Sequence, residues 1–337
     1  MRKTRKDEHL MNYLKTEYQG DNLLDNIYLE HEALSELNFE DIDTTIDLFG
    51  KKVKFPLIIN AMTGGTEMSE SINADLSLLA EKYNLPMAVG SQQIALDDEE
   101  ARESFEVIKE SLSDENIIIA NLSARASLDE MERAVDMIRA DAIGLHLNSC
   151  QELIMTEGER DFKGIIDNIG QAQKRFGDRL LVKEVGYGMR AETVKRLYDL
   201  GVKNIDISGH GGTNFTEIED MRDYQADFED LYNWGIPTAK AIINARSISD
   251  DLNIIGAGGI KKASDIVKSL VIGANCTAMS GELLKYLLHG DFDYACLFVE
   301  SLIYKTKIMM LMLGAKDIKA LKKVPYKTFG KLREILD

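Results

Sequence analysis

The sequence contains no apolar run that reaches the roughly 18 residues needed to span a bilayer. Its N-terminus is charged and has no apolar core of the kind that marks a secretory signal. Cysteine is scarce as well, because only Cys150, Cys276 and Cys296 occur, far apart and odd in number. This pattern excludes a disulfide framework and a clustered cysteine metal site. We therefore expect a cytoplasmic protein that does not associate with a membrane.

Positive charge is also in short supply. The chain has 40 Lys and Arg residues against 57 Asp and Glu residues, which leaves a formal net charge of −17. A protein this acidic is a poor candidate for binding nucleic acid, since neutralising phosphates requires clustered Lys and Arg. One basic cluster does occur, at Arg2–Lys6, close to His9. It is either a solvated N-terminal segment or an arm that folds over an anionic small molecule.

Eight short apolar runs are spread along the chain, and each is nearly continuous rather than alternating with polar residues. Such runs are typical of parallel strands that are buried on both faces. Helical patterns lie between them, and no linker or low-complexity segment divides the 337 residues. The predicted strands are Leu57–Asn60, Met87–Val89, Ile117–Ala120, Ala142–Leu147, Leu180–Lys183, Asn204–Ile207, Asn253–Gly256 and Cys276–Met279. The predicted helices include Ser71–Tyr83, Leu128–Arg139, Phe162–Arg175, Ala191–Leu200 and Lys262–Leu270.

This alternation predicts an α/β fold, a TIM (β/α)8 barrel, in a single domain over residues 1–337. A doubly wound sheet is the alternative, but it rarely needs eight regular units. Residues 1–50 are expected to form an N-terminal helix and a cover over the substrate, and residues 290–337 to form C-terminal helices. The segment Phe215–Ile248 is long for one connection, so we expect an elongated loop followed by the sixth helix.

Polar residues and glycines follow nearly every predicted strand. In a TIM barrel the active site lies at the carboxyl ends of the strands, so these residues should meet in one site. The loops Gly256–Gly259 and Ser280-Gly281 each lead into a predicted helix, as the common phosphate site of this fold does, although ordinary turn glycines are the alternative. The other strand ends carry Met62–Gly65, Gly90–Gln93, Asn121, His146–Glu152, Lys183-Glu184 and Ser208–Thr213.

Several of these side chains could carry chemistry. Lys183 could be a Schiff-base nucleophile, a partner for an anion or a donor to a cofactor ring, or it could pair with the glutamate that follows it. His146 and Asn148 alternate with leucines along one strand, so both should face the barrel interior. Gln151 is a weak acid and base, and the adjacent Glu152 could bind Mg²⁺ that bridges a diphosphate.

Taken together, these segments resemble the type 2, FMN-dependent isopentenyl-diphosphate delta-isomerases of isoprenoid biosynthesis. The resemblance covers nearly the whole chain, and its specificity comes from the whole ordered set rather than from any single motif. The matching segments are Arg5–His9, Met62–Gly65, Val89–Gln92, Ala120–Leu122, His146–Glu152, Glu157–Phe162, Val182–Gly186, Ser208–Thr213 and Gly258–Lys261.

The resemblance implies a barrel that holds FMN and interconverts isopentenyl and dimethylallyl diphosphate. It also implies that NADPH reduces the FMN, that Mg²⁺ is required, and that the protein forms a homotetramer or homo-octamer. By resemblance, the flavin and its ribityl chain would contact Ala61, Met62, Thr63, Ser91, Asn121, Lys183, Ser208 and Thr213. The FMN phosphate would contact Gly259, Lys261, Ser280 and Gly281.

The same resemblance implies roles for the substrate and catalytic groups. Gln151, His146 and Lys183 would be catalytic, and Glu152 would bind Mg²⁺. In that family the reduced flavin is the leading candidate for acid and base, with Gln151 orienting or relaying the second proton. The sequence leaves open which group makes each transfer. The substrate would contact Arg5, Lys6, His9, Ser91, Asn148 and Gln151.

The chain departs from the usual pattern of that family at a few positions. Ser149-Cys150 stands where a proline is common, and His210 where a small residue is usual. Lys261 replaces a common arginine, so it keeps the positive charge but loses the planar fork of donors. These differences leave the local geometry open.

Three other functions share part of this pattern. An FMN-dependent 2-hydroxy acid oxidase or dehydrogenase carries a histidine base in a loop similar to Ser208–Gly212, but it has an arginine where Thr213 stands. A nucleotide dehydrogenase of the inosinate type needs a nucleophilic cysteine at the barrel mouth, whereas Cys276 lies within a predicted strand. A non-catalytic flavin-binding protein would have no need of Gln151 and Glu152.

Overall fold

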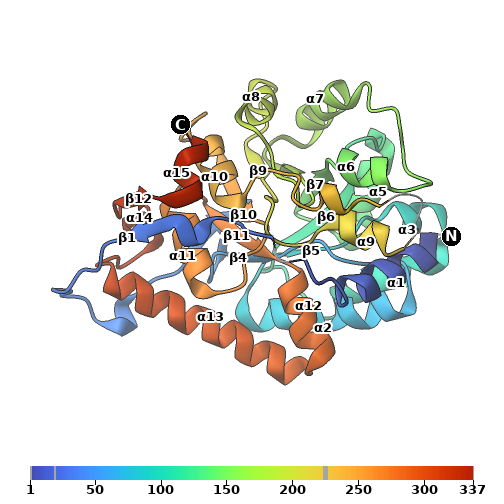
Figure 1. Cartoon of the computed structure of the whole chain (residues 1–337). Coiled ribbons are helices and arrows are strands. Elements are labelled where there is room, and N and C mark those ends of the chain that lie inside the picture. The colour runs from blue at the N-terminus through green and yellow to red at the C-terminus, as the bar shows by residue number, and fades with distance from the viewer. Residues whose placement is uncertain (1, 19, 223–226, 337) are drawn as a thin grey trace.

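Eight parallel strands close into a barrel in the computed structural model, which describes residues 2–18, 20–222 and 227–336. Each strand pairs with the next one in sequence, and the last pairs with the first (Figure 1). The prediction of a TIM barrel is therefore confirmed. The strands are β4 (Leu57–Ile59), β5 (Met87–Ala88), β6 (Ile118–Ser123), β7 (Ala142–His146), β8 (Leu180–Lys183), β9 (Asn204–Asp206), β10 (Asn253–Ala257) and β11 (Cys276–Met279).

Strand β6 differs most from its predicted range, because it continues to Ser123 instead of ending at Ala120. Its pairing with β7 runs through Ser123 opposite His146. The polar Asn121 lies inside the strand and is buried, although its polarity had suggested a strand end. Since backbone pairing with a neighbour decides where a strand ends, the side chains alone mislead at this position.

Buried side chains form one cluster inside the barrel and a larger one between the strands and the surrounding helices. The inner cluster includes Ile58, Leu181 and Ile255, which alternate along their strands with residues that face the helices. Two short strands, β2 (Ile46–Leu48) and β3 (Lys51–Val53), form an antiparallel hairpin whose Leu48 and Val53 join this inner cluster. The hairpin packs near the amino ends of the strands, so it lies opposite the end where the site is expected.

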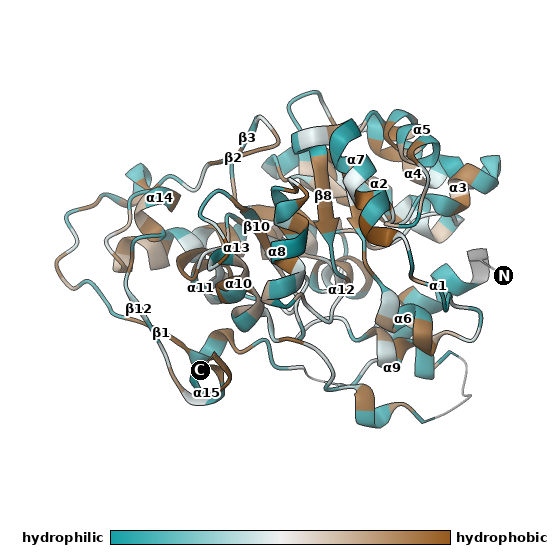
Figure 2. Cartoon of the chain, turned by 90° about the horizontal axis from the view of Figure 1, so that it is seen from above, coloured by the Kyte–Doolittle hydropathy of each residue, from teal (hydrophilic) through white to brown (hydrophobic). Residues whose placement is uncertain are grey.

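Helices surround the strands, and the apolar strands lie inside a more polar exterior (Figure 2). Helix α2 begins at Glu67, earlier than predicted, because Thr66 caps it by accepting a hydrogen bond from the backbone N–H of Ser69. Helix α7 begins at Ile165, later than predicted, directly after Gly164 with a φ of 80°. The other principal helices are α5 (Leu128–Ile138), α8 (Ala191–Asp199), α10 (Thr238–Arg246), α11 (Ala263–Val271), α12 (Gly281–His289) and α13 (Phe292–Met312), and α2 and α7 end at Tyr83 and Phe176.

The two terminal segments meet each other, which the sequence did not predict. Strand β1 (Ile27–Leu29) pairs antiparallel with β12 (Tyr326–Thr328), so the C-terminal segment contains a strand besides the helices α14 (Ile318–Leu321) and α15 (Gly330–Leu336). Both strands have only three residues and carry no alternation that a sequence pattern could reveal. Residues 1, 19 and 337 of the two predicted segments lie outside the described residues, as do residues 223–226 of the long connection.

Three helices gather beside the carboxyl ends of the strands (Figures 1 and 2). They are α1 (Arg2–Tyr13) from the N-terminal segment, α6 (Ser149–Ile154) after β7, and α9 (Phe215–Asp220) after β9. Helix α9 contacts both of the others and lies in the long connection, where the sequence predicted an elongated loop before the sixth helix and no additional helix. No helix in the part of the chain that the structure describes is long and apolar enough to cross a bilayer.

Candidate active site

A cavity of about 500 Å³ opens at the carboxyl ends of the barrel strands, and we call it the mouth cavity. Its walls come from the strand ends, and α1 covers it with Leu10 and Tyr13 in addition to its charged residues. Seventeen residues proposed from the sequence line it: Arg5, Lys6, His9, Ala61, Met62, Thr63, Ser91, Asn121, His146, Asn148, Gln151, Glu152, Lys183, Ser208, Thr213, Ser280 and Gly281.

A narrower hollow of about 80 Å³ adjoins the mouth cavity and shares Ser208, Thr213, Ser280 and Gly281 with it. This glycine-lined pocket contains the remaining two proposed residues, Gly259 and Lys261. The structure therefore brings all of the proposed residues into two adjoining cavities.

Two glycines of the glycine-lined pocket lie too close to neighbouring atoms to carry a side chain. A Cβ on Gly212 would overlap the backbone N of Gly259, and one on Gly281 would overlap the hydroxyl of Tyr13. Gly281 is also the first residue of α12, a helix of nine residues. Exposed backbone N–H groups at a helix N-terminus suit an anion, so this pocket fits the phosphate of a cofactor. Tyr13 was not predicted from the sequence, because its position depends on how α1 docks.

Lys183 is buried at the end of β8 and lines the mouth cavity. Its Nζ donates a 2.6 Å hydrogen bond to the backbone carbonyl of Glu184, not to the carboxylate. The Glu184 carboxylate instead accepts hydrogen bonds from four successive backbone N–H groups, those of residues 185–188. Burial nevertheless raises the pKa of Glu184 to about 7, against the opposing effect of these donors. The suggested Lys183–Glu184 ion pair is therefore not formed, and the ammonium group is held at the cavity wall.

His146 faces the barrel interior at the end of β7, as its alternation with leucines predicted. Its Nδ1 lies 3.1 Å from Oδ1 of Asn121 on the neighbouring strand. Burial lowers the pKa of His146 to about 3, and the positive charges of Lys183 and Lys6 contribute to this shift. The imidazole is therefore neutral at physiological pH, with one ring nitrogen as donor and the other as acceptor.

Gln151 lies on α6, and its Nε2 donates a 3.1 Å hydrogen bond to Oε1 of Glu219 on α9. The same carboxylate oxygen lies 2.9 Å from Nε2 of His9, and Oε2 accepts a 2.8 Å bond from Arg222. Burial alone would raise the pKa of Glu219, but its contacts with His9 and Arg222 keep that pKa below the ordinary value. Glu219 thus orients Gln151 and joins α1, α6 and α9 at one point.

A second set of charges fastens α1 over the mouth cavity. Arg222 donates a 2.7 Å bond to Glu157, and Nη1 of Arg5 lies 3.5 Å from the other oxygen of that carboxylate. The Arg222 guanidinium lowers the pKa of Glu157 to about 2. Glu157 belonged to a motif recognised in the sequence, but Glu219 and Arg222 carried no signal, because they sit in a long connection with no strand end to mark them.

Glu152 follows Gln151 on α6 and also lines the mouth cavity. Its Oε1 accepts a 2.9 Å bond from Asn148, and its Oε2 accepts one of 2.9 Å from the backbone N–H of Glu159. Within the described ranges there is no group of three or more His, Cys, Asp or Glu side chains that could hold a metal alone. A single carboxylate still fits Mg²⁺, which is commonly held by one or two carboxylates together with substrate phosphates and water.

His210 contributes to neither cavity. Its Nε2 lies 3.1 Å from the hydroxyl of Tyr18, and its backbone bonds to Ile236. The imidazole is buried and lies against Tyr18 of the N-terminal segment. It is therefore not placed to act as the base that a 2-hydroxy acid oxidase would require.

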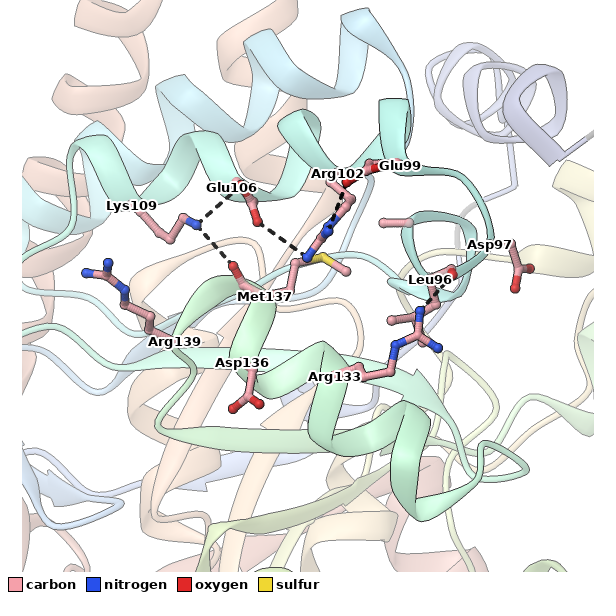
Figure 3. Close-up of a pocket in the computed structure, with 11 residues that line it drawn as sticks. Leu96, Asp97, Glu99, Arg102, Glu106, Lys109, Arg133, Asp136, Met137 and Arg139 are labelled. Carbon is pink, nitrogen blue, oxygen red and sulfur yellow. Dashed lines mark hydrogen bonds and ion pairs between the residues drawn. The ribbon is translucent and has the colours of Figure 1, made fainter.

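A separate hollow of about 620 Å³ lies outside the barrel, beside α3 (Gln93–Asp97) and α5 (Figure 3). Three of its cations are already engaged. Arg102 lies 3.6 Å from Glu99, Lys109 donates to the carbonyl of Met137, and Arg133 donates to the carbonyl of Leu96 (Figure 3). The hollow contains none of the proposed residues, so the mouth cavity is the stronger candidate despite its smaller volume.

Comparison with known proteins gives relatives over nearly the whole chain. The family model for FMN-dependent dehydrogenases matches residues 151–326. A protein of Geobacillus sp. (strain WCH70) named isopentenyl-diphosphate delta-isomerase is 40% identical over 326 residues, which cover 96% of this chain and 93% of that protein. A protein of Listeria welshimeri with the same name is 36% identical over 336 residues, covering 99% of this chain and 94% of its own length.

Solved structures share the fold at low sequence identity. A flavocytochrome b2 variant with sulfite bound has a TM-score of 0.72 and 17% identity, and the match covers 97% of this chain and 84% of that one. A mandelate oxidase variant has a TM-score of 0.65 and 14% identity, with 95% and 92% covered. At such identities the likeness shows the barrel fold and nothing about the reaction.

Proposed function

This chain belongs to the isopentenyl-diphosphate delta-isomerases, and we propose that it interconverts isopentenyl and dimethylallyl diphosphate inside the mouth cavity with FMN as its cofactor. The observation that carries the proposal is the convergence of Lys183, His146 and Gln151 with the cationic arm of α1 in one cavity. Reduced FMN, when bound, would supply an acid–base ring system beside the alkene. The glycine-lined pocket suits its phosphate, since Gly259, Lys261, Ser280 and Gly281 line it and Gly281 begins α12.

Three side chains of α1 are suited to hold the diphosphate. Arg5, Lys6 and His9 all line the mouth cavity, and Nζ of Lys6 donates a 2.8 Å bond to the backbone carbonyl of Ser91. Asn148 also lines the mouth cavity, beside Glu152. Ionic hydrogen bonds between such donors and a diphosphate are stronger than neutral ones. We therefore propose that the diphosphate binds between α1 and α6, with Ser91 and Asn148 as further contacts.

The chemistry requires a dry and well-oriented site, because an unactivated alkene is a very poor base. Helix α1 closes one side with Leu10, and the long connection adds Phe215 and Ile218 to the lining. Closing a cavity with apolar side chains excludes water and strengthens the electrostatic interactions inside it. Gln151 and His146 project into this space and can hold or pass a proton at their amide and imidazole atoms.

The test begins with the purified protein. It should show a flavin absorption spectrum, and after anaerobic addition of NADPH and Mg²⁺ it should convert isopentenyl diphosphate to dimethylallyl diphosphate. Absence of dimethylallyl diphosphate would refute the proposal that this chain catalyses the isomerisation with FMN reduced by NADPH. Consumption of lactate or glycolate would instead point to a 2-hydroxy acid oxidase.

Replacing Glu152 with glutamine should raise the Mg²⁺ concentration that supports half-maximal turnover by at least about tenfold. The amide keeps the shape of the side chain but removes the negative charge that a hard divalent cation prefers. Titration of Mg²⁺ against the initial rate measures the effect. Glu192→Gln, on the exposed side of α8, is the matched control. If the two variants titrate alike, Glu152 is not the metal ligand.

We also propose that the chain is a homo-oligomer, a tetramer or octamer, and that α13 contributes to its interface. Most residues of this helix are apolar. Tyr294, Leu297 and Tyr304 lie on one face and are 51%, 61% and 58% exposed. Contiguous exposed apolar side chains of this kind mark a protein contact.

Replacing Leu297 with glutamate should therefore lower the molar mass measured by light scattering, because a charge would be buried in the contact. Leu34→Glu is a matched control, since Leu34 is 82% exposed in a loop of the N-terminal segment. An unchanged mass for Leu297→Glu would show that α13 is not part of the interface.

We also propose that residues 1–337 form a single domain, which the pairing of β1 with β12 supports. We propose a cytoplasmic location as well, which the scarcity of cysteine supports.

A further inference from the structure

A third cavity lies directly beside the mouth cavity, and we call it the side cavity. It has a volume of about 300 Å³ and extends from the end of β7 toward α7 and α8. Both cavities are lined by the same five residues, Ser123, Arg125, His146, Asn148 and Glu152. The hydrogen bond between Asn148 and Glu152 therefore runs along a wall that the two cavities share. The function proposed above uses the mouth cavity and leaves the side cavity without a role.

The inner lining of the side cavity is mostly apolar. Phe162 comes from the loop after α6, and α7 and α8 supply most of the other apolar residues. The apolar lining consists of Leu147, Phe162, Ile165, Ile166, Ile169 and Leu197. A hollow of this size that is open to solvent and walled by branched aliphatic side chains suits a hydrocarbon chain better than a polar group.

Five polar residues of the side cavity lie where it meets the mouth cavity. One of them is Arg125 after β6, whose Nη1 lies 2.9 Å from the Glu159 carboxylate. Arg196, on the exposed side of α8, lines the side cavity only. Asn148 and Glu152, which we assigned to the diphosphate and its Mg²⁺, are at the same junction. A ligand that fits both features has an anionic head at the junction and an apolar chain that runs away from it.

We propose that the side cavity binds the hydrocarbon chain of a prenyl diphosphate longer than the substrate, with its diphosphate at the position that the substrate's diphosphate occupies. This inference rests on the placement of the diphosphate proposed above. The five-carbon substrate reaches only the mouth cavity, where the reacting groups lie. A longer chain can take the other direction from the same head position, and it then places no double bond beside Gln151 or Lys183.

Such a ligand would be a competitive inhibitor and not a substrate. Longer prenyl diphosphates arise from condensation of the two isomers that this enzyme interconverts, so the inhibitor would be a product of the reaction that consumes the enzyme's product. Burial of one additional isoprenoid unit in an apolar cavity should strengthen binding by at least about tenfold, because even one methylene group can change affinity that much.

The experiment uses the FMN-loaded holoenzyme with Mg²⁺ and measures inhibition of isopentenyl diphosphate turnover by geranyl diphosphate, a ten-carbon prenyl diphosphate. Inorganic pyrophosphate tests the head alone, and geraniol tests the chain alone. We expect geranyl diphosphate to compete with the substrate and to inhibit at least about tenfold more tightly than pyrophosphate. Geraniol should inhibit weakly, since it has no group for the junction.

Two variants at one position of α7 test where the chain lies. Ile166→Trp should fill the side cavity and weaken inhibition by geranyl diphosphate about tenfold or more, while KM for the substrate and inhibition by pyrophosphate stay unchanged. Ile166→Leu conserves the volume and should behave like the natural protein. Calorimetric binding of geranyl diphosphate to both variants provides a readout that does not depend on turnover.

The remaining outcomes would overturn the inference. Equal inhibition of both variants would place the chain in the mouth cavity, and inhibition no tighter than that by pyrophosphate would show that the side cavity takes no chain. If Ile166→Trp weakens binding of NADP⁺ and not of geranyl diphosphate, the cavity serves the nucleotide reductant. Normal turnover of isopentenyl diphosphate in the uninhibited enzymes keeps any of these results separate from a failure of the proposed function.

Discussion

Replacing Gln151 with alanine should lower kcat by about 10³-fold and leave FMN bound. A positioned group that transfers or orients a proton typically contributes between about 10² and 10⁴ in rate. The surrounding protein fixes the position of Gln151, because its Nε2 donates to the buried Glu219. That bond leaves the amide oxygen as the acceptor that can face the cavity. Steady-state rates and the flavin absorbance of the purified variant measure the two parts of the prediction.

The control is Gln171→Ala, the same substitution at an exposed position of α7. Glu219→Gln provides a second comparison, since it keeps the size of the partner while weakening its hold on Gln151, and it should cause a smaller loss of rate. Loss of flavin from Gln151→Ala would mean that the residue is structural. A rate close to that of the natural protein would exclude it from the proton transfer.

Replacing Lys183 with methionine should lower kcat by about 10² to 10³-fold. A fixed positive charge in a closed cavity stabilises negative charge that develops beside it, and losing one such group commonly costs that much. Lys183 is buried, and its carbonyl partner fixes the ammonium without neutralising its charge. Lys195→Met, on the exposed face of α8, is the matched control. If Lys183→Met loses no more rate than this control, the ammonium has no part in the reaction.

The same variant should also change the titration of His146, which can be followed by NMR in the flavin-free protein. Burial is the main cause of the depressed pKa of about 3, and the positive charge of Lys183 is the next. Removing that charge should raise the pKa of His146, although burial will keep it below the ordinary value of 6.5. An unchanged pKa would show that the two groups do not interact.

The sign of the accompanying stability change follows from proton linkage. Because the folded-state pKa of His146 is below that of the unfolded chain, the unfolded state binds more protons between about pH 3 and pH 6.5. The contribution of His146 to the free energy of unfolding is therefore largest above pH 6.5, and it falls as the pH drops toward 3. In Lys183→Met this window should be narrower, since the folded-state pKa moves upward.

Much of the fold and of the candidate site could be predicted from the sequence, and the reason lies in local patterns. Buried parallel strands are short apolar runs, and eight of them alternating with helices allow few other architectures. Once the barrel is predicted, its parallel topology alone places the carboxyl ends of all the strands at the same end of the barrel. That is why Ser91, Lys183 and Gly281, far apart in the chain, could be expected to line one pair of cavities.

The sequence determined less wherever a contact joins segments without a regular pattern. The docking of α1, the role of Glu219 and Arg222, and the pairing of β1 with β12 all depend on the path of long connections. Loop paths are set by many weak contacts between residues distant in sequence, so no short motif records them. The sequence by itself therefore determined the barrel and the residues at its strand ends, because both follow from strand periodicity. The roles of those residues, and the place of Arg5, Lys6 and His9, came from the family resemblance. Only the tertiary structure decided which atoms those residues meet: the Lys183 ammonium against a carbonyl, Gln151 against Glu219, and His210 outside the site.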